Sequence, residues 1–376
     1  MDPNHWVYAA EGNQNIVLRY TGQDQSYVGH VLRLQKDKAV DARFQPAFVH
    51  DVIGALLGHD YIVPLTCVPV TLTFLKSIET KITHDRPDHR RARTIDLNQS
   101  WACLAPDLTF QSALTVEIKP KWGYKPTWSS LTKPWMSEKY KHVKATTCRF
   151  CMHSWYKHSR SDLEYCPLDL YSMEPARMNR ALKALERESA LHDKMQIKQQ
   201  EVQNLEENQV IEMIIAILCQ EPLLPRLKTL QRDLDQLTIE GIHSIYATKS
   251  SSLLPMYDID VWRKVVQCFK RRDMSMILSD AIDPALECQY LYEHVLSAVL
   301  KDCSIFISII RDTVDRCDDN FQGCKIQLDN GEAYHYTVKV VDTDLKNMSK
   351  IPYWYDLDQR IVEHATRHHT TKVCHE

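Results

Sequence analysis

The feature that most limits how this chain of 376 residues can fold is a basic segment at residues 117–160. It carries ten Lys and Arg against two Glu, whereas the whole chain has a formal net charge of −3. Such a local excess of positive charge implies an anionic partner, and the alternative is a solvated charged face. Aromatic residues also lie among these cations, so a nucleic-acid groove and a small polyphosphate site are both open. They include Trp122, Tyr124, Trp128, Trp135, Tyr140 and Trp155.

Composition places the chain among ordinary folded proteins. With 44% hydrophobic and 25% charged residues it can bury a sizeable core, and its length predicts two lobes or domains. Nine glycines are too few for collagen-like or linker sequence. The N-terminus lacks the pattern of a signal peptide, and no stretch approaches the ~20 apolar residues of a membrane span. We therefore expect an intracellular protein, cytoplasmic or nuclear, with no membrane partner.

Twelve cysteines are scattered through the chain, and without a signal peptide we expect them to be reduced thiols. The exception is Cys148-x-x-Cys151-x-His153 with Cys166 further on, which imitates half of a zinc site. A closed tetrahedral site would need a fourth ligand at a plausible distance. The sequence shows no second Cys-x-x-Cys pair, so we expect that this segment does not bind zinc.

The first residues alternate like an antiparallel sheet, with short apolar runs at 6–8, 16–20 and 27–34 around a loop at 10–15. Strand, short Gly/Asn loop, strand, turn and a third strand with a basic residue form the plan of a kinase N-lobe. In that plan, loop amides cover the nucleotide phosphates and a cation on the third strand meets them. Any antiparallel hairpin pair would show the same pattern.

The next segments mix helices and strands, and the centre of the chain is helical. We expect a helix at 46–58, a buried strand region at 60–75, an arginine-rich loop at 84–98, and strands at 101–110 and 114–118, with a hinge between them. Apolar spacing predicts core helices after 172–175 and at Val210–Leu218, Leu223–Leu237 and Tyr290–Leu300. The polar stretch 192–208 gives no clear signal.

Two acidic positions mark strand ends in the last quarter of the chain. Asp302 precedes the apolar run 305–310, and the run 334–341 leads into Asp342 and Asp344. Phosphoryl transfer uses such a pair of carboxylates, one to orient or deprotonate the attacking hydroxyl and one to hold Mg²⁺. The alternative is that these are capping or surface aspartates.

Together these segments resemble one family, the inositol-pentakisphosphate 2-kinases. The resemblance runs in order from end to end of the chain. The residues that carry it are EGNQNIVL (11–18), VLRLQK (31–36), VEIKPKWG (116–123), CRFCMH with Lys157 (148–157), PLDL (167–170), IEGI (239–242), KDCSI (301–305) and DTDLK (342–346), followed by IPYWYDLDQRIV (351–362).

The resemblance implies an α+β, two-lobed, protein-kinase-like fold with an additional inositol-phosphate-binding region in the C-lobe. The N-lobe would span 1–106 and the C-lobe 107–376. The implied reaction transfers the γ-phosphate of ATP, with Mg²⁺, to the 2-hydroxyl of inositol 1,3,4,5,6-pentakisphosphate and gives inositol hexakisphosphate. Five phosphates at about −1.5 to −2 each carry roughly −7.5 to −10, a charge that the basic segment could balance.

The resemblance also implies roles for single residues. Asp302 matches the catalytic aspartate, and Asp342 with Asp344 the metal ligands. The nucleotide would be held by Gly12, Asn13, Arg33, Asp107 and Glu117. The substrate phosphates would be held by Arg90, Lys119, Lys121, Arg149, His153, Lys157, Lys346 and Lys350. Because this assignment gives Arg149 and His153 to phosphate, it argues further against zinc at the Cys-x-x-Cys pair.

Two alternatives stay open at this point. A kinase of other inositol phosphates would keep the carboxylates and the basic cluster. A non-catalytic binder of nucleic acid or phosphoinositide would need only residues 117–160, and it leaves KDCSI and DTDLK unexplained. We expect ATP and inositol pentakisphosphate as ligands, no nucleic acid, and a monomer. The loop at 10–15 is poorer in glycine than is usual in the family, although Asn13 tolerates a positive φ better than most residues.

Overall fold

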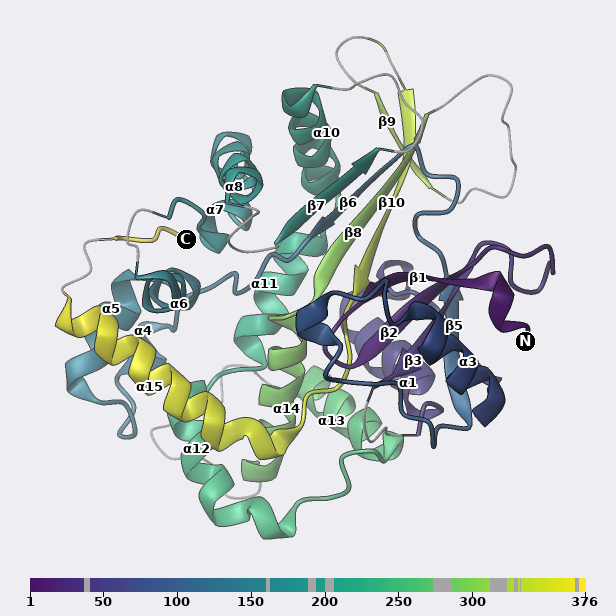
Figure 1. Ribbon diagram of the computed structural model, residues 1–376. Helices are drawn as coiled ribbons and strands as arrows, with labels where there is room; N and C mark the ends of the chain where they lie inside the picture. Colours follow the sequence, from purple (N-terminus) through teal and green to yellow (C-terminus); the bar gives the residue numbers. More distant parts are fainter. Residues whose placement is uncertain are drawn as a thin grey trace.

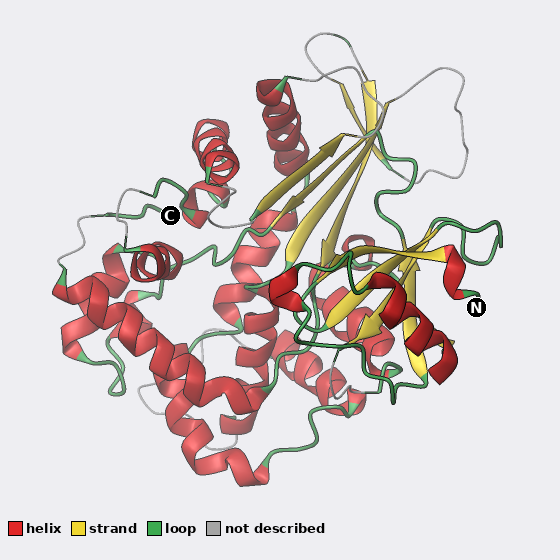
Figure 2. Ribbon diagram, in the orientation of Figure 1, coloured by secondary structure: helices red, strands yellow, loops and turns green. Residues whose placement is uncertain are grey.

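The computed structural model describes residues 1–36, 41–159, 163–188, 194–199, 206–272, 286–311, 323–327, 331, 333–368 and 372–376. Within these ranges the chain forms two five-stranded antiparallel sheets surrounded by helices (Figures 1 and 2). The α+β class expected from the sequence is confirmed. The division into lobes at residue 106 stays a prediction. None of the described helices is long and apolar enough to cross a membrane.

The first sheet is built from the N-terminal third of the chain. Its strands lie in the order β1 (Trp6–Glu11), β2 (Asn15–Tyr20), β3 (His30–Gln35), β5 (Trp101–Pro106) and β4 (Thr66–Pro69). Alternate residues point inward, as a half-buried strand requires, and helix α3 (Leu72–Ile82) covers them. The buried core of this unit includes Trp6, Ile16, Leu18, Leu32, Leu34, Phe74, Leu75 and Ile78.

The second sheet joins strands from distant parts of the sequence. Its order is β7 (Met195–Gln199), β6 (Leu114–Ile118), β8 (Ser304–Arg311), β10 (Ala333–Val341) and β9 (Cys324–Gln327). Ser304 at the start of β8 pairs with Val341 at the end of β10. Ile118 at the end of β6 pairs with Ile305 on one side and with Met195 on the other. Four chain segments therefore enter or leave the sheet at one end.

Helices pack on this second sheet and around it (Figure 1). The longer ones are α5 (Glu138–Thr146), α6 (Arg149–His158), α8 (Pro175–Arg187), α10 (Glu207–Gln220), α11 (Leu223–Asp233), α12 (Thr238–Lys249), α13 (Ile259–Arg271), α14 (Glu287–Leu300) and α15 (Ile351–Arg367). The short helices and turns are η1 (Pro3–His5), α1 (Phe44–Ala47), η2 (Phe48–Gly54), α2 (Ala55–Leu57), η3 (His59–Tyr61), η4 (Asp88–Arg90), α4 (Trp128–Leu131), α7 (Pro167–Leu170), η5 (Ser250–Ser252) and η7 (Met348–Lys350).

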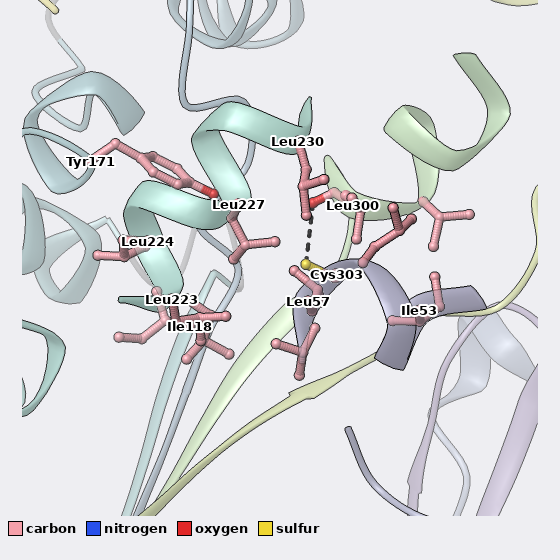
Figure 3. Close-up of a cluster of buried hydrophobic side chains, with 14 of the residues drawn as sticks. Ile53, Leu57, Ile118, Tyr171, Leu223, Leu224, Leu227, Leu230, Leu300 and Cys303 are labelled. Atoms are coloured by element: carbon pink, nitrogen blue, oxygen red, sulfur yellow. Dashed lines mark hydrogen bonds between the residues drawn. The ribbon is translucent and has the colours of Figure 1, made fainter. Parts of the chain in front are cut away.

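The apolar core lies directly behind the strand ends. Figure 3 shows leucines of α11 packed against Ile118 of β6 and Leu57 of α2. Cys303, just before β8, is fully buried there, and its Sγ donates to the Leu300 carbonyl at 3.2 Å. The strand ends thus rest on a packed layer, which fixes the polar residues that follow them.

Most of the predicted elements are present, with two corrections. The region 60–75 was expected as strand, but only Thr66–Pro69 is strand, and α3 starts at Leu72. The physical reason is local: Pro69 ends the strand, and the Thr71 side chain caps the helix by accepting from the Phe74 N–H at 3.2 Å. The second correction is β7, which forms in the polar stretch that gave no signal.

Candidate active site

The end of the second sheet gathers the residues that the sequence predicted as catalytic. Asp302 lies two residues before β8, and Asp342 comes directly after β10. Because β8 and β10 are antiparallel in this register, the two aspartates leave the sheet at the same end. Lys119 and Lys121 follow β6 at that end as well. The backbones of Lys121 and Asp342 have φ values of 65° and 59°, a strained conformation that is concentrated at functional sites.

Asp302 lies between two of the predicted phosphate-binding lysines. Lys121 Nζ is 2.7 Å from its Oδ1, and Lys346 Nζ is 2.7 Å from its Oδ2. Burial opposes ionisation of this carboxyl, but the two ammonium groups outweigh burial and hold the pKa of Asp302 well below its usual range. The carboxylate is therefore ionised at neutral pH, and about half of it is exposed to solvent (51%).

Helix α6 presents the second group of cations. Arg149, His153 and Lys157 are four residues apart, so they share one face of the helix. Burial, followed by the charges of Arg149, Lys157, Lys194 and Lys121, lowers the pKa of His153 to about 4. His153 is therefore neutral at pH 7, and Arg149 and Lys157 of α6, Lys121 after β6 and Lys194 before β7 all contribute positive charge at its ring.

Arg149 is held in place by an acidic residue of α15. Its Nε donates to Asp358, a buried carboxylate that also accepts from Lys144 at 2.8 Å. The guanidinium lies over the Trp122 ring at 5.7 Å. Neither terminal nitrogen of Arg149 makes a hydrogen bond within the described ranges, so both can bind an anion.

Lys194 is a basic residue of this group that the sequence did not single out. It immediately precedes β7, and its carbonyl accepts from the Lys119 N–H at 2.8 Å. Burial and then the charges of Lys121, Lys119 and Lys157 lower the pKa of Lys194 to about 8. In the part of the chain that the structure describes, its ammonium has no carboxylate within ion-pair distance. A half-buried lysine among other lysines is an arrangement suited to binding an anion.

The first sheet contributes the β1–β2 loop and side chains that hydrogen-bond to Asp344 near this site. Asp344 accepts from Asn15 Nδ2 at 2.8 Å, from Arg33 Nη2 at 3.0 and 3.1 Å, and from Gln45 Nε2 at 2.9 Å. Arg33 and Asp344 therefore form an ion pair with each other. Asp342 differs, because its exposed carboxylate has no hydrogen bond or ion pair among the described residues.

The predicted nucleotide loop sits in the β1–β2 turn. The Gly12 N–H donates to the Asn15 carbonyl at 3.0 Å, and Asn13 is exposed. Beneath the loop, the buried carboxylate of Glu11 pairs with Lys36 and, at 2.9 Å, with Arg86. Lys36 Nζ also donates to the Gly12 carbonyl at 2.8 Å. This buried cluster fixes the loop from below, and sequence reasoning missed its charged members.

The comparisons with known proteins agree with this geometry. A family model described as inositol-pentakisphosphate 2-kinase matches residues 8–360. The chain belongs to the inositol-pentakisphosphate 2-kinase family. Proteins with that name in Cryptococcus neoformans and Danio rerio are each 26% identical to it, and the one in Arabidopsis thaliana is 25% identical. These alignments cover 96–98% of this chain and 92–94% of the relatives.

Four other residues to which the resemblance assigns roles lie apart from Asp302 and Asp342 or make other contacts. Asp107 accepts from Arg19 Nε at 2.7 Å and from the Thr109 N–H at 2.9 Å, so its carboxylate holds the turn after β5. Arg90 donates to the Glu11 carbonyl, on the nucleotide loop and not among the α6 cations. Glu117 has Lys119 Nζ at 3.9 Å. Lys350 is exposed at the end of η7, before α15.

The Cys-x-x-Cys pair also differs from expectation. Cys148, Cys151 and Cys166 do have a fourth partner, Cys374, and His153 is not a member of the group. The sequence did not point to this fourth residue, because Cys374 is more than 200 residues away from the other three.

Proposed function

We propose that this chain transfers the γ-phosphate of ATP to the 2-hydroxyl of inositol 1,3,4,5,6-pentakisphosphate and produces inositol hexakisphosphate. We further propose that it does so in a two-lobed, kinase-like fold, with ATP at the first sheet and the inositol phosphate at the cations of β6, β7 and α6. One observation carries the proposal: an ionised Asp302 lies between two lysines, at the edge of a concentrated group of cations.

The cation group suits a small ligand of very high negative charge. It comprises Lys119, Lys121, Arg149, Lys157, Lys194 and Lys346, with neutral His153 among them. A ligand with a net charge of roughly −7.5 to −10 would be balanced by such a group together with local proton uptake. In the free protein, Asp302 partly neutralises Lys121 and Lys346. Ligand phosphates would compete for these two lysines and so free the carboxylate.

Asp302 then orients the attacking hydroxyl. Its pKa is too low for a strong base, but phosphoryl transfer requires mainly positioning and charge stabilisation. As Lys121 and Lys346 turn to ligand phosphates, the pKa of Asp302 rises and the carboxylate becomes a better proton acceptor. The same two lysines thus bind the substrate and adjust the catalytic group.

The residues present fit a Mg²⁺ ion at Asp342. Mg²⁺ prefers oxygen ligands, usually one or two carboxylates together with nucleotide phosphates, and Asp342 offers an exposed and unengaged carboxylate among the described residues. When bound, the ion would neutralise charge on the transferred phosphate. Asp344, the second expected ligand, supports the site by joining Arg33 and β2 to the segment after β10.

The aromatic residues favour a small ligand over a nucleic-acid groove. Tyr124 is buried and donates to Asp235 at 2.7 Å, and Trp135 Nε1 donates to the Leu237 carbonyl at 3.0 Å. Trp122 stacks on Tyr124 with 6.3 Å between the ring centroids. Trp128 is 67% exposed, whereas the other aromatic residues of the segment are buried or half-buried, so Trp128 is the main platform of the kind that single strands need.

The test is direct. Purified protein, Mg-ATP and inositol pentakisphosphate lacking the 2-phosphate should yield hexakisphosphate, identified by anion-exchange chromatography. A panel of inositol phosphates with other free hydroxyls should react far more slowly. If the panel reacts equally well, the chain is a general inositol-phosphate kinase. If no substrate reacts while an oligonucleotide binds tightly through Trp128, the proposal fails.

A further inference from the structure

A buried amide side chain joins the two chain segments that bear Lys121 and Asp302. Gln231 lies in the last turn of α11 and is fully buried (0% exposed). Its Nε2 donates to the carbonyls of Lys121 and Leu300, each at 3.0 Å, and its Oε1 accepts from the Gly123 N–H at 2.8 Å. Lys121 and Gly123 follow β6, and Leu300 ends α14 two residues before Asp302. One side chain therefore holds main-chain groups of both segments.

We propose that Gln231 is a positioning residue for phosphoryl transfer, which sets the separation of Lys121 and Asp302 through their main chains. The other buried side chains of α11 are leucines, and an amide among them costs free energy unless its polar atoms are hydrogen-bonded. The amide oxygen and the amide nitrogen of Gln231 both have partners, and these partners belong mainly to the two segments. A leucine at this position would fill similar space and would join nothing.

The contacts also explain how Lys121 keeps an unusual backbone conformation. Its φ of 65° is strained, and such a conformation persists only where the surroundings fix it. The Lys121 carbonyl accepts from Gln231 and, at 3.3 Å, from the Tyr171 hydroxyl. Gln231 thus holds the main chain of Lys121 and leaves the ammonium free to move from Asp302 to a ligand phosphate.

A buried carboxylate ties the same two segments together a second time. Asp235 lies two residues after the end of α11, and its Oδ2 accepts from the Tyr124 hydroxyl at 2.7 Å and from Lys301 Nζ. Tyr124 belongs to the segment after β6, and Lys301 is the residue before Asp302. Burial opposes ionisation, but the charge of Lys301 outweighs it and holds the pKa of Asp235 well below its usual range. The segments cannot shift relative to each other without disturbing both ties.

This separation matters because the reaction uses Lys121 and Asp302 on one substrate. The lysine binds a phosphate while the carboxylate orients the hydroxyl, and a displacement of ~1 Å in such a pair can cost ~10²-fold in rate. The positioning role therefore rests on the proposed function, whereas the hydrogen bonds of Gln231 do not.

Kinetics of Gln231→Met in the full chain test the inference. Methionine is unbranched and of similar length, so it fills the space and removes the hydrogen bonds of the amide. Turnover should fall about tenfold or more and the KM for inositol pentakisphosphate should rise about threefold, with the KM for ATP unchanged. The control Val266→Ala removes buried volume from α13 and should lower the melting temperature without changing these constants.

A double-mutant cycle separates positioning from a general loss of structure. In the Lys121→Ala background, the effect of Gln231→Met on kcat/KM should shrink from about 30-fold to under about fivefold, because the ammonium that Gln231 positions is already absent. A purely structural residue would lower kcat/KM by the same factor in both backgrounds, and that result would overturn the inference.

A milder variant decides the question if circular dichroism shows that Gln231→Met does not fold. Tyr124→Phe removes one hydroxyl and with it part of the second tie, so turnover should fall about threefold with the KM for ATP unchanged. Ordinary turnover in that variant would then refute the role. An active wild type with an equally active Gln231→Met overturns the inference and leaves the proposed function intact, whereas a wild type that makes no hexakisphosphate overturns both.

Discussion

Lys194 gives the sharpest quantitative test of the proposed substrate site. Its pKa of about 8 means that about half of the free protein lacks this charge at pH 8. A bound polyanion offsets the repulsion from Lys121, Lys119 and Lys157, so the pKa in the complex should return to about 10.4 or above. Binding of inositol pentakisphosphate should then take up about half a proton at pH 8 through this residue, and about a tenth at pH 7.

The sign of the pH dependence follows from the same shift. Because the complex has the higher pKa, the protonated form of Lys194 binds more tightly. The affinity for inositol pentakisphosphate is highest below pH 8, and it falls as the pH rises through 8 toward the pKa of Lys194 in the complex. Between pH 7 and pH 9 this one group should weaken binding about tenfold.

Calorimetry in buffers of different ionisation enthalpy measures the proton uptake. Ligand phosphates also exchange protons, so the informative quantity is the difference between the wild type and Lys194→Met. Lys76→Met, which changes an exposed lysine of α3, is the matched control and should behave as the wild type. If wild type and Lys194→Met take up the same number of protons at pH 8, Lys194 does not face the ligand and the reasoning is refuted.

Four other changes have defined outcomes. Asp302→Asn should lower turnover by at least ~10²-fold with an unchanged or lower KM for inositol pentakisphosphate, since Lys121 loses its competitor; near-normal turnover in a kinetic assay would contradict its role. Lys121→Ala should raise that KM by the equivalent of about 1.5–3 kcal/mol and leave the KM for ATP unchanged, which initial-rate measurements would show. Asp342→Ala should abolish activity, and EDTA should stop the wild type until Mg²⁺, and not Zn²⁺, is restored; activity in EDTA would exclude the metal role. Asp358→Ala leaves Lys144 with a single buried partner, so urea denaturation should show that the free energy of unfolding falls by about 3–5 kcal/mol. A decrease under about 1 kcal/mol would show that water reaches the pair of Lys144 and Asp358.

The sequence allowed correct prediction where the signal is local. Alternation in the run 334–341 and the apolar run 305–310 identified two strands, and acidic residues were expected at the ends of these strands. Apolar spacing identified α10, α11 and α14. These features depend on residues close in the chain, where periodicity and capping decide the conformation.

The rest depends on pairing between distant residues. Lys194 lies in a polar stretch, and it reaches the site only because Met195 pairs with Ile118, which no local pattern indicates. Cys374 joins the other cysteines through the path of the tail. The resemblance implied Asp344 as a metal ligand, and no local pattern indicated that Asn15 and Arg33 of the other sheet and Gln45 of α1 would hydrogen-bond to it.

The segment after β10 has one more consequence. Within five residues it carries Asp342, the proposed metal ligand, Asp344, which accepts from Arg33 of the first sheet, and Lys346, which donates to Asp302. Any ligand that binds one of these side chains therefore acts on the same short stretch of backbone. Binding of ATP and binding of the inositol phosphate should therefore be coupled, and the coupling is reciprocal. Each ligand should change the dissociation constant of the other by the same factor. Weakening the link with Asp344→Asn should bring that factor toward one.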